Sequence, residues 1–366
     1  MKNNKIIVGI TQGDINGIGY EVIIKALSDP RMVELCTPVI YGSPKVAAYH
    51  KKVLNDETLN LHQIRSAVEA DNNKVNILNC CDENVRVELG KSTSEAGEAA
   101  YLALEHAVND LKMDVIDVLV TAPVNKENIQ SENFKFPGHT EFLAEQFEAQ
   151  NPLMLLVSEN LRVGVATGHV PLKDVSGLLT KELIVSKIKT LHHSLVADFA
   201  CTNPRIAVLG LNPHSGDNGL LGNEENEVII PALKQVADMG ITALGPFAAD
   251  GFFGSGQQYK FDAILDMYHD QGLAPFKAIT FDTGVNFTAG LKYVRTSPGH
   301  GTAYDIAGED KASFESFKEA IYQAIDIYRN REIYKEASKK PLSKYEIGHN
   351  GESDHVDLTK EDNTDF

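Results

Sequence analysis

The chain has few cysteines and no long apolar run. Its four cysteines show no CxxC spacing, and the adjacent pair Cys80 and Cys81 does not resemble a disulfide framework. We therefore expect free or buried thiols in a reducing compartment. No stretch approaches the roughly 20 apolar residues of a membrane span. The N-terminal segment MKNNKIIVGI also lacks the apolar core of a signal peptide, so the sequence predicts a cytoplasmic protein.

The chain has fewer basic than acidic residues. The 51 acidic and 34 basic side chains give a formal net charge of -17. Such a balance disfavours nucleic acid or an anionic membrane surface as a partner. A phosphorylated ligand would need a locally basic pocket.

Three common motifs are missing: the G-x-G-x-x-G dinucleotide fingerprint, the Walker loop and the serine nucleophile elbow. The glycine-rich loop that is present, GDINGIGYE at 13–21, follows an apolar strand-like segment. Its glycines permit a tight turn and a close approach of the backbone to a ligand. Two interpretations stay open: a plain strand-to-helix turn, or a cradle for an anion or substrate.

Strand-like and helix-like segments alternate along the chain, which predicts an α/β fold with mainly parallel sheets. The length of 366 residues favours two α/β lobes. The expected strands are 5–10, 38–41, 75–78, 115–120, 154–157, 162–166, 205–209, 241–244, 263–265, 285–290 and 293–295. The expected helices are 20–27, 45–54, one from Ser94, one at Thr140 with Thr140 as its cap, 225–239 and 314–329. Residues 341–366 form an acidic tail that we expect to be loosely ordered.

The segment DAILDMYHDQGLAPFK at 262–277 is the centre of the predicted site. Its apolar run leads within a few residues to His269, Asp270 and Lys277. Ligands of α/β proteins bind at the C-terminal ends of strands, so this order of residues is typical of an active site.

His169, His214 and His269 each follow a predicted strand. Three imidazoles with an open position would suit a catalytic Zn²⁺ or another divalent metal. A structural or merely polar role is the alternative for each of them. Asp250 and Asp270 could ligate the metal, orient a histidine, accept a proton, or simply cap a loop.

A second group of residues offers cationic groups, hydroxyls and amides at strand ends, which a phosphorylated hydroxy acid would require. Solvated surface positions are the alternative for these residues. They are His139, Thr140, Lys277, Asn286 and Arg295.

Six segments together resemble the 4-hydroxythreonine-4-phosphate dehydrogenase family of vitamin B6 biosynthesis, in order, from about residue 5 to 330. They are GDINGIGYE, FPGHTEF, ATGHVPL, LNPHSGDNGLLGNEE, DMYHDQGLAPFK and GLKYVRTSPGHGTAYDIAG. The resemblance implies a fold like that of isocitrate and isopropylmalate dehydrogenases, not a Rossmann fold. It implies two α/β/α lobes around a cleft, 1–135 with 296–340 and 136–295, the second carrying metal and homodimer contacts.

The resemblance also implies roles for individual residues. His169, His214 and His269 would bind Zn²⁺, Mg²⁺ or Co²⁺, with His269 donated by the second subunit. The five residues of the second group would bind the phosphorylated substrate. The cofactor NAD, or NADP, would lie on His300, Gly301, Thr302 and Asp305. Lys277, Asp250 and Asp270 would take part in catalysis.

The implied reaction is oxidation of 4-phosphohydroxy-L-threonine to its 3-oxo acid, followed by decarboxylation to 3-amino-2-oxopropyl phosphate. Dehydrogenation of D-erythronate or D-threonate 4-phosphate is one alternative. A metal-dependent lyase or hydrolase and a non-catalytic metabolite-binding protein are others. The chain has Ile15, Asn16 and Tyr20 where the family commonly has Pro, Ala and Pro, and we expect the loss of two prolines to loosen this turn.

Overall fold

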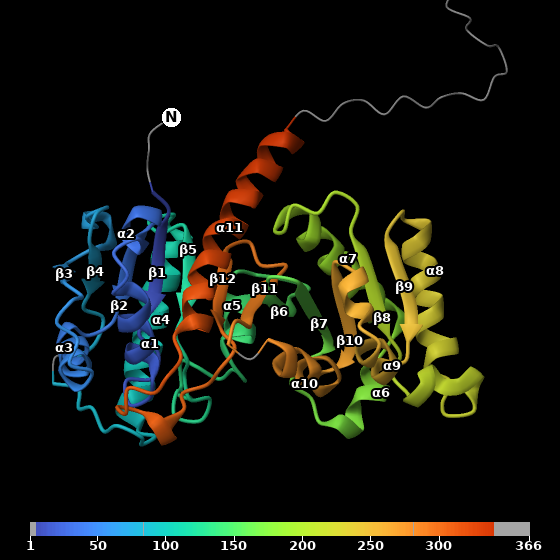
Figure 1. Ribbon diagram of the computed structural model, residues 1–366, viewed down its shortest axis with the longest axis horizontal. Helices are drawn as coiled ribbons and strands as arrows, with labels where there is room; N and C mark the ends of the chain where they lie inside the picture. Colours follow the sequence, from blue (N-terminus) through green and yellow to red (C-terminus); the bar gives the residue numbers. More distant parts are fainter. Residues whose placement is uncertain (1–4, 83, 281, 340–366) are drawn as a thin grey trace, which may run out of the picture.

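The computed structural model describes residues 5–82, 84–280 and 282–339, so the predicted tail at 341–366 lies outside the described residues. Twelve strands form one sheet in the order β3-β4-β2-β1-β5-β12-β11-β6-β7-β10-β8-β9, with helices on both of its faces (Figure 1). The pairings β11–β12, β11–β6 and β6–β7 are antiparallel and the others are parallel. The predicted α/β fold with a mainly parallel sheet is confirmed, and this strand order is not that of a Rossmann fold.

The first part of the sheet is parallel throughout. Its strands are β1 (Ile7–Thr11), β2 (Thr37–Tyr41), β3 (Leu61–Ile64), β4 (Val75–Leu78), β5 (Val118–Thr121) and β12 (Val294–Pro298). Its helices are α1 (Gly19–Leu27), α2 (Met32–Leu35), α3 (Pro44–Val53) and α4 (Ser94–Lys112). Helices α3 and α4 begin where Ser43 and Thr93 accept hydrogen bonds from backbone N–H groups of the first turn.

The other part of the sheet is reached through two antiparallel strands, β11 (Val285–Ala289) and β6 (Leu153–Ser158). Its parallel strands are β7 (Leu161–Thr167), β8 (Arg205–Leu209), β9 (Thr242–Phe247) and β10 (Ala263–Tyr268). Its helices are α5 (His139–Gln146), α6 (Val175–Leu178), α7 (Lys181–Ala197), α8 (Ile230–Asp238), α9 (Ala249–Gly254) and α10 (His269–Ile279). Each described helix is too short or too polar to cross a bilayer.

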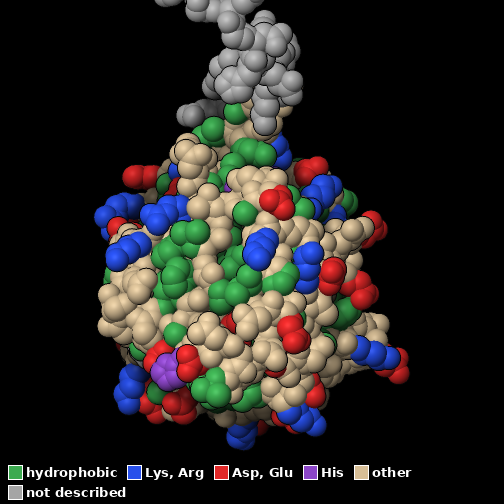
Figure 2. All heavy atoms as spheres, turned by 90° about the vertical axis from the view of Figure 1, so that its right-hand side faces the viewer, with side chains coloured by type: hydrophobic (Ala, Val, Ile, Leu, Met, Phe, Trp, Pro, Cys, Tyr) green, Lys and Arg blue, Asp and Glu red, His purple; other side chains and the backbone are tan. Residues whose placement is uncertain are grey.

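Strand β9 is an edge strand and leaves Leu244 exposed. Met239, which follows α8 and shortly precedes β9 in the sequence, is also exposed. Figure 2 shows hydrophobic side chains gathered across the middle of the face at this end of the molecule. The face therefore combines free strand-edge backbone groups with apolar side chains.

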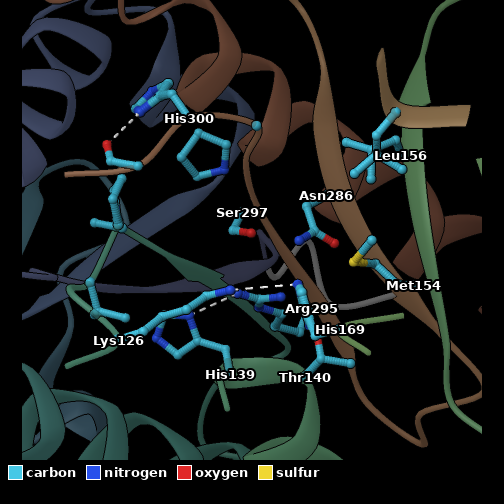
Figure 3. Close-up of a pocket in the computed structure, with 18 of the residues that line it drawn as sticks. Lys126, His139, Thr140, Met154, Leu156, His169, Asn286, Arg295, Ser297 and His300 are labelled. Carbon is cyan, nitrogen blue, oxygen red and sulfur yellow. Dashed lines mark hydrogen bonds between the residues drawn. The ribbon is translucent and has the colours of Figure 1, made fainter. Parts of the chain in front are cut away.

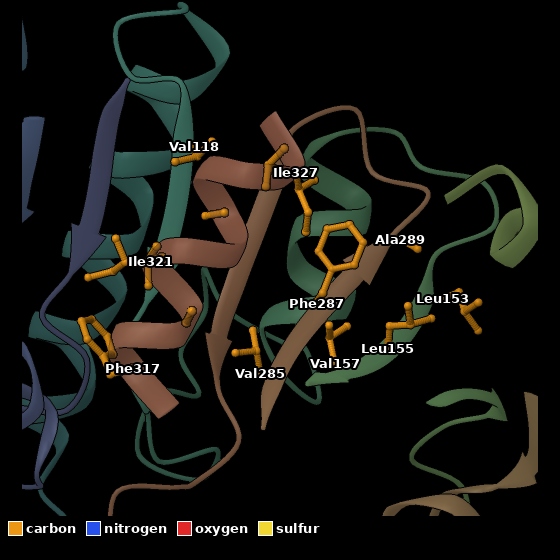
Figure 4. Packing of buried hydrophobic residues seen from close by; sticks show 14 of the residues in the cluster. Val118, Leu153, Leu155, Val157, Val285, Phe287, Ala289, Phe317, Ile321 and Ile327 are labelled. Atoms are coloured by element: carbon orange, nitrogen blue, oxygen red, sulfur yellow. The ribbon is translucent and has the colours of Figure 1, made fainter. Parts of the chain in front are cut away.

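Helix α11 (Glu315–Ser338) packs across the middle of the sheet, where the two parts meet (Figure 4). Phe317, Ile321 and Ile325 recur every four residues and are buried against the strands. The helix is longer than the predicted 314–329, because Arg331 in its later part forms a 2.6 Å ion pair with the buried Asp198. The lobe limits at 135/136 and 295/296 stay a prediction.

Six elements and one cap differ from the predictions. The sequence patterns did not predict β3, α2, α6, α7, α9 or α10. Helix α10 contains Gly272 and Pro275, which are uncommon inside helices. The predicted cap Thr140 lies within α5, which begins at His139 after Gly138 and has no side-chain cap.

The expected loosening of the first turn stays a prediction, and the structure shows which contacts hold this turn. Asn16 and Tyr20 are fully buried. The Tyr20 hydroxyl donates to Gln12 Oε1 at 2.8 Å, and its ring stacks on His50. Asn16 Oδ1 accepts a 2.7 Å hydrogen bond from the Glu88 backbone N–H. Hydrogen bonds and packing hold this turn in place of proline rigidity.

Candidate active site

A pocket of about 250 Å³ lies over the middle strands of the sheet, between its two parallel parts (Figure 3). Its walls come from the ends of β5, β7, β10 and β12, from the first turn of α5, and from β6 and β11. The lining residues are Ala122, Pro123, Val124, Lys126, Gly138, His139, Thr140, Glu141, Met154, Leu156, His169, His269, Leu273, Lys277, Asn286, Arg295, Ser297, Pro298, Gly299, His300 and Gly301. All five predicted substrate residues are among them.

Arg295 is the charged centre of the pocket floor. The residue is 2 % exposed, and its guanidinium donates through Nε and Nη2 to Thr121 Oγ1, at 3.1 and 2.6 Å. Burial lowers the pKa of Arg295 to about 10, so the group is charged at neutral pH. A buried charge without a counter-ion is unfavourable, and an anionic ligand would offset this cost.

His139 completes this floor from the first turn of α5. Its Nδ1 accepts a 3.1 Å hydrogen bond from Arg295 Nη2. Burial, reinforced by the charges of Arg295 and Lys126, holds the pKa of His139 well below its ordinary value. The ring is therefore neutral and offers Nε2–H as a donor. The free N–H groups at the start of α5 also favour an anion.

Unpaired polar atoms concentrate in this pocket. In the described part of the chain, 13 buried side-chain nitrogen or oxygen atoms have no hydrogen-bond partner. Five of them belong to pocket residues, namely His139 Nε2, Glu141 Oε2, Asn286 Oδ1, Arg295 Nη1 and His300 Nε2. Buried polar atoms are normally paired, so a group of unpaired ones marks a place prepared for a polar ligand.

Two residues that were not predicted as site residues contact His169. Lys126 Nζ lies 3.5 Å from His169 Nε2, and Glu141 Oε1 lies 3.5 Å from His169 Nδ1. The interaction with His169 is the main reason that the pKa of Glu141 is lowered. The signal for Lys126 was available, since it follows β5 in the strand-end sequence TAPVNK.

The structure brings two of the three predicted metal ligands together. His169 and His269 follow the neighbouring strands β7 and β10, and their ring centroids are 5.5 Å apart. His214 follows β8, the next strand of the sheet, but is exposed and does not line the pocket. Within residues 5–82, 84–280 and 282–339, no three His, Cys, Asp or Glu side chains of one chain form a ready metal site.

The two predicted carboxylates differ in position. Asp270 Oδ1 lies 2.7 Å from His269 Nδ1, so Nε2 is the ring nitrogen that remains for a ligand. This is the usual arrangement of a carboxylate behind a ligand histidine. Asp250 lies in the first turn of α9, exposed and outside the pocket lining.

The predicted cofactor loop adjoins the pocket. His300 and Gly301 line it, and burial lowers the pKa of His300. Thr302 joins this loop to the first glycine-rich turn, because its carbonyl accepts a 3.0 Å hydrogen bond from Ile18 N–H. Asp305 is exposed outside the pocket. A nucleotide could lie along these two loops, whose backbones approach closely at Gly17.

Several known proteins are similar to this chain over most of its length. Residues 34–324 match the family described as pyridoxal phosphate biosynthetic protein PdxA. The 4-hydroxythreonine-4-phosphate dehydrogenase of Bacteroides thetaiotaomicron is 55% identical, over 98% of both chains. A putative D-threonate 4-phosphate dehydrogenase of Oceanobacillus iheyensis is 38% identical over 89% of this chain and 98% of its own.

A solved structure is also similar. The crystal structure of 4-hydroxythreonine-4-phosphate dehydrogenase from Klebsiella pneumoniae superposes with a TM-score of 0.78 and 32% identity, covering 89% of this chain and 99% of its own. The family match covers most of the chain and includes the pocket described above. The chain therefore belongs to the PdxA family and is an oxidoreductase with an isocitrate dehydrogenase-like α/β fold.

Proposed function

We propose that this enzyme oxidises 4-phosphohydroxy-L-threonine with NAD to the 3-oxo acid, which then loses CO₂ to give 3-amino-2-oxopropyl phosphate. The observation that carries the proposal is the buried, incompletely paired Arg295 beside the neutral His139. An acidic protein that places a buried guanidinium at a pocket floor is suited to a small anionic ligand. The names of its relatives supply the substrate class.

The phosphate of the substrate would lie against Arg295 Nη1 and His139 Nε2–H, with Thr140, Asn286 and Lys277 around it. This fixed anchor would orient the rest of the substrate toward His169 and His269. Orientation of this kind supplies up to roughly 7–11 kcal/mol of a reaction barrier.

His169, His269 and His214 would hold a divalent metal, because imidazole nitrogens suit Zn²⁺ or Co²⁺ and two of the rings already stand close together. When bound, the metal would lower the pKa of the substrate hydroxyl. Asp270 would orient His269, and Glu141 would orient His169.

Two lysines of the pocket would stabilise the negative charge that develops on the substrate. The hydroxyl proton would pass to water as NAD takes the hydride, and Lys126, beside His169, would donate a hydrogen bond to the oxygen left behind. Lys277, on the last turn of α10, would stabilise the enolate that decarboxylation leaves. His300, Gly301 and Thr302 would contact the nucleotide, and the exposed Asp305 would contact its ribose from the loop end.

We further propose that two copies of the chain share each site in a cytoplasmic homodimer. One chain brings only two of the three histidines to the pocket. Exposed leucines flank the histidine segments: Leu172 and Leu178 follow His169, and Leu220 and Leu221 follow His214. Their burial against a second copy would complete the ligand set.

The deciding experiment follows NADH formation with 4-phosphohydroxy-L-threonine, D-erythronate 4-phosphate and D-threonate 4-phosphate, each with and without a strong chelator. We expect chelator-sensitive turnover of the amino acid. Preference for D-threonate 4-phosphate would favour the second candidate, which is supported by the 38% identical Oceanobacillus iheyensis relative. No NADH from any of the three would contradict the dehydrogenase proposal.

A further inference from the structure

The segment that carries His214 has an unusual backbone. From His214 to Gly219, every φ angle is positive. Four of these six residues are not glycine: His214 (φ 53), Ser215 (φ 52), Asp217 (φ 43) and Asn218 (φ 57). L-residues normally visit the left-handed region one at a time, because Cβ then crowds the following carbonyl. Such a run persists only where its surroundings enforce it, and it is typical of functional sites.

Glu225 is the side chain that binds the start of this left-handed turn. It is 2 % exposed and opens a π-helical segment, η4 (Glu225–Ile229). Glu225 Oε1 accepts hydrogen bonds from the backbone N–H groups of Leu211 and Asn212, at 2.8 and 2.7 Å. Glu225 Oε2 accepts a third from Asn212 Nδ2 at 3.0 Å. The carboxylate thereby satisfies the strand-end donors immediately before His214.

Two glycines make room for this carboxylate. A Cβ atom at Gly216 would lie 2.6 Å from Glu225 Oε2, and one at Gly210 would lie 3.1 Å from Glu225 Oε1. The left-handed turn thus wraps directly around the Glu225 side chain. Glu225 and the turn are complementary in shape as well as in hydrogen bonding.

The same segment is tied to the strand end that carries His269. Gln271 Nε2 donates a 2.6 Å hydrogen bond to the Gly210 carbonyl, and Gln271 Oε1 accepts a 2.7 Å hydrogen bond from Met267 N–H. Gln271 therefore spans the ends of β8 and β10. Gln271 thereby fixes the position of the turn that Glu225 holds, relative to the strand end that carries His269.

We propose that Glu225 is a positioning residue, which enforces the left-handed turn and so presents the His214 imidazole to a divalent metal in the shared site. The inference rests on the metal site proposed above. Glu225 acts through the backbone and does not itself touch the metal. Groups that orient a metal ligand without touching the metal typically contribute about 10–100-fold to metal affinity, and we expect an effect of this order.

The test compares the full-length parent with Glu225→Ala, Glu225→Gln and the control Glu227→Ala, since Glu227 is exposed on the same π-helical segment. Amide hydrogen exchange is measured without metal, and Co²⁺ binding is followed by visible absorption. We expect Glu225→Ala to speed exchange within 211–222, to weaken Co²⁺ binding about 10–100-fold and to alter the Co²⁺ spectrum. Glu225→Gln should be intermediate, because its amide keeps an acceptor for the two backbone donors but faces Asn212 Nδ2 with a donor.

Unchanged Co²⁺ affinity and spectrum in Glu225→Ala would overturn the inference, whatever happens to stability. Equal loss of protection in β7, β8 and β10 would also overturn it, because Glu225 would then support the whole fold. If the parent itself fails to bind Co²⁺, this result contradicts both the proposed metal site and the positioning role of Glu225. That outcome differs from failure of the inference alone, in which the parent and Glu225→Ala bind Co²⁺ equally.

Discussion

Arg295 Nη2 donates a 3.1 Å hydrogen bond to Nδ1 of His139, although the two residues are 156 positions apart in the chain. The contact joins β12 to the first turn of α5 at the floor of the pocket. It sets the tautomer of His139, whose remaining nitrogen then carries the proton. The pocket thereby presents donors from both residues to an anion.

Arg295→Lys should raise the KM for the phosphorylated substrate much more than it lowers the turnover number. Lysine keeps the charge but carries its donors on one nitrogen, so it cannot replace the donors that Arg295 spreads over Nε, Nη1 and Nη2. Loss of charged hydrogen bonds of this kind costs about 1.5–3 kcal/mol, or roughly 10–150-fold in affinity. Steady-state kinetics of the purified variant measures this. An unchanged KM would show that the phosphate lies elsewhere.

His50→Gln should flatten the dependence of stability on pH below neutrality. Burial lowers the pKa of His50 to about 4. As pH falls below about 6.5, the unfolded chain takes up a proton that folded His50 does not, so stability is lost by up to about 1.4 kcal/mol per pH unit. Glutamine does not titrate and can still donate to the Ile15 carbonyl, as His50 Nε2 does at 2.8 Å.

Urea unfolding at pH 7 and pH 5 measures this effect. For each protein, the free energy of unfolding at pH 5 is subtracted from that at pH 7. An effect of altered stacking on Tyr20 that is the same at both pH values then cancels. His106→Gln, at an exposed position, serves as the control and should keep the slope of the parent. A parental slope in His50→Gln would mean that this ring is protonated in the folded protein.

Asp266→Asn should stabilise the protein at pH 7.5 and have little effect near pH 4. Asp266 is fully buried, neither of its oxygens has a partner among the described residues, and burial raises its pKa well above the ordinary value. Above about pH 4 the unfolded carboxyl ionises while the folded one stays protonated, so stability is lost as pH rises. The parent loses up to about 1.4 kcal/mol of stability for each pH unit above about 4, and the asparagine variant avoids this loss because its amide does not titrate.

Thermal unfolding between pH 4 and pH 7.5 checks this expectation, with the exposed Asp238→Asn as its control. A loss of stability in Asp266→Asn at pH 7.5 would indicate that the carboxylate has a partner, such as a bound cation.

Mixing inactive variants should reveal which histidine crosses the dimer interface. His169 and His269 of one chain are already neighbours, so His214 is the candidate for donation by the second subunit. Co-refolded His169→Ala and His214→Ala should then recover about a quarter of parental activity, because half of the dimers are mixed and each has one intact site. His169→Ala with His269→Ala should recover none.

Recovery only in the mixture of His169→Ala with His269→Ala would support the prediction made from the sequence, in which His269 is the donated ligand. Recovery in neither mixture would indicate that each chain builds its own site. Metal content of the mixed samples, measured after gel filtration, separates loss of binding from loss of turnover.

Local sequence patterns were sufficient to predict most strands of the sheet. Strands such as 75–78 and 205–209 were predicted with the observed limits, because short apolar runs between polar turns are a local signal. Helix α10 was missed, since Gly272 and Pro275 oppose helix formation locally. Its packing against β7 and β10 decides its conformation. The strand-end positions of the site residues were also predictable, whereas Lys126 and Glu141 were recognised only through their distance to His169.

The sequence by itself determined the α/β class, the family and the residues available for chemistry, because these depend on periodicity and on motifs. Only the tertiary structure decided how the residues are used. Burial of Arg295 against His139, the pairing of His169 with His269, and the wrapping of the His214 turn around Glu225 all join segments distant in the chain. Electrostatic interactions, desolvation and hydrogen bonds depend on which groups lie close together in space. Composition and sequence spacing do not specify these contacts.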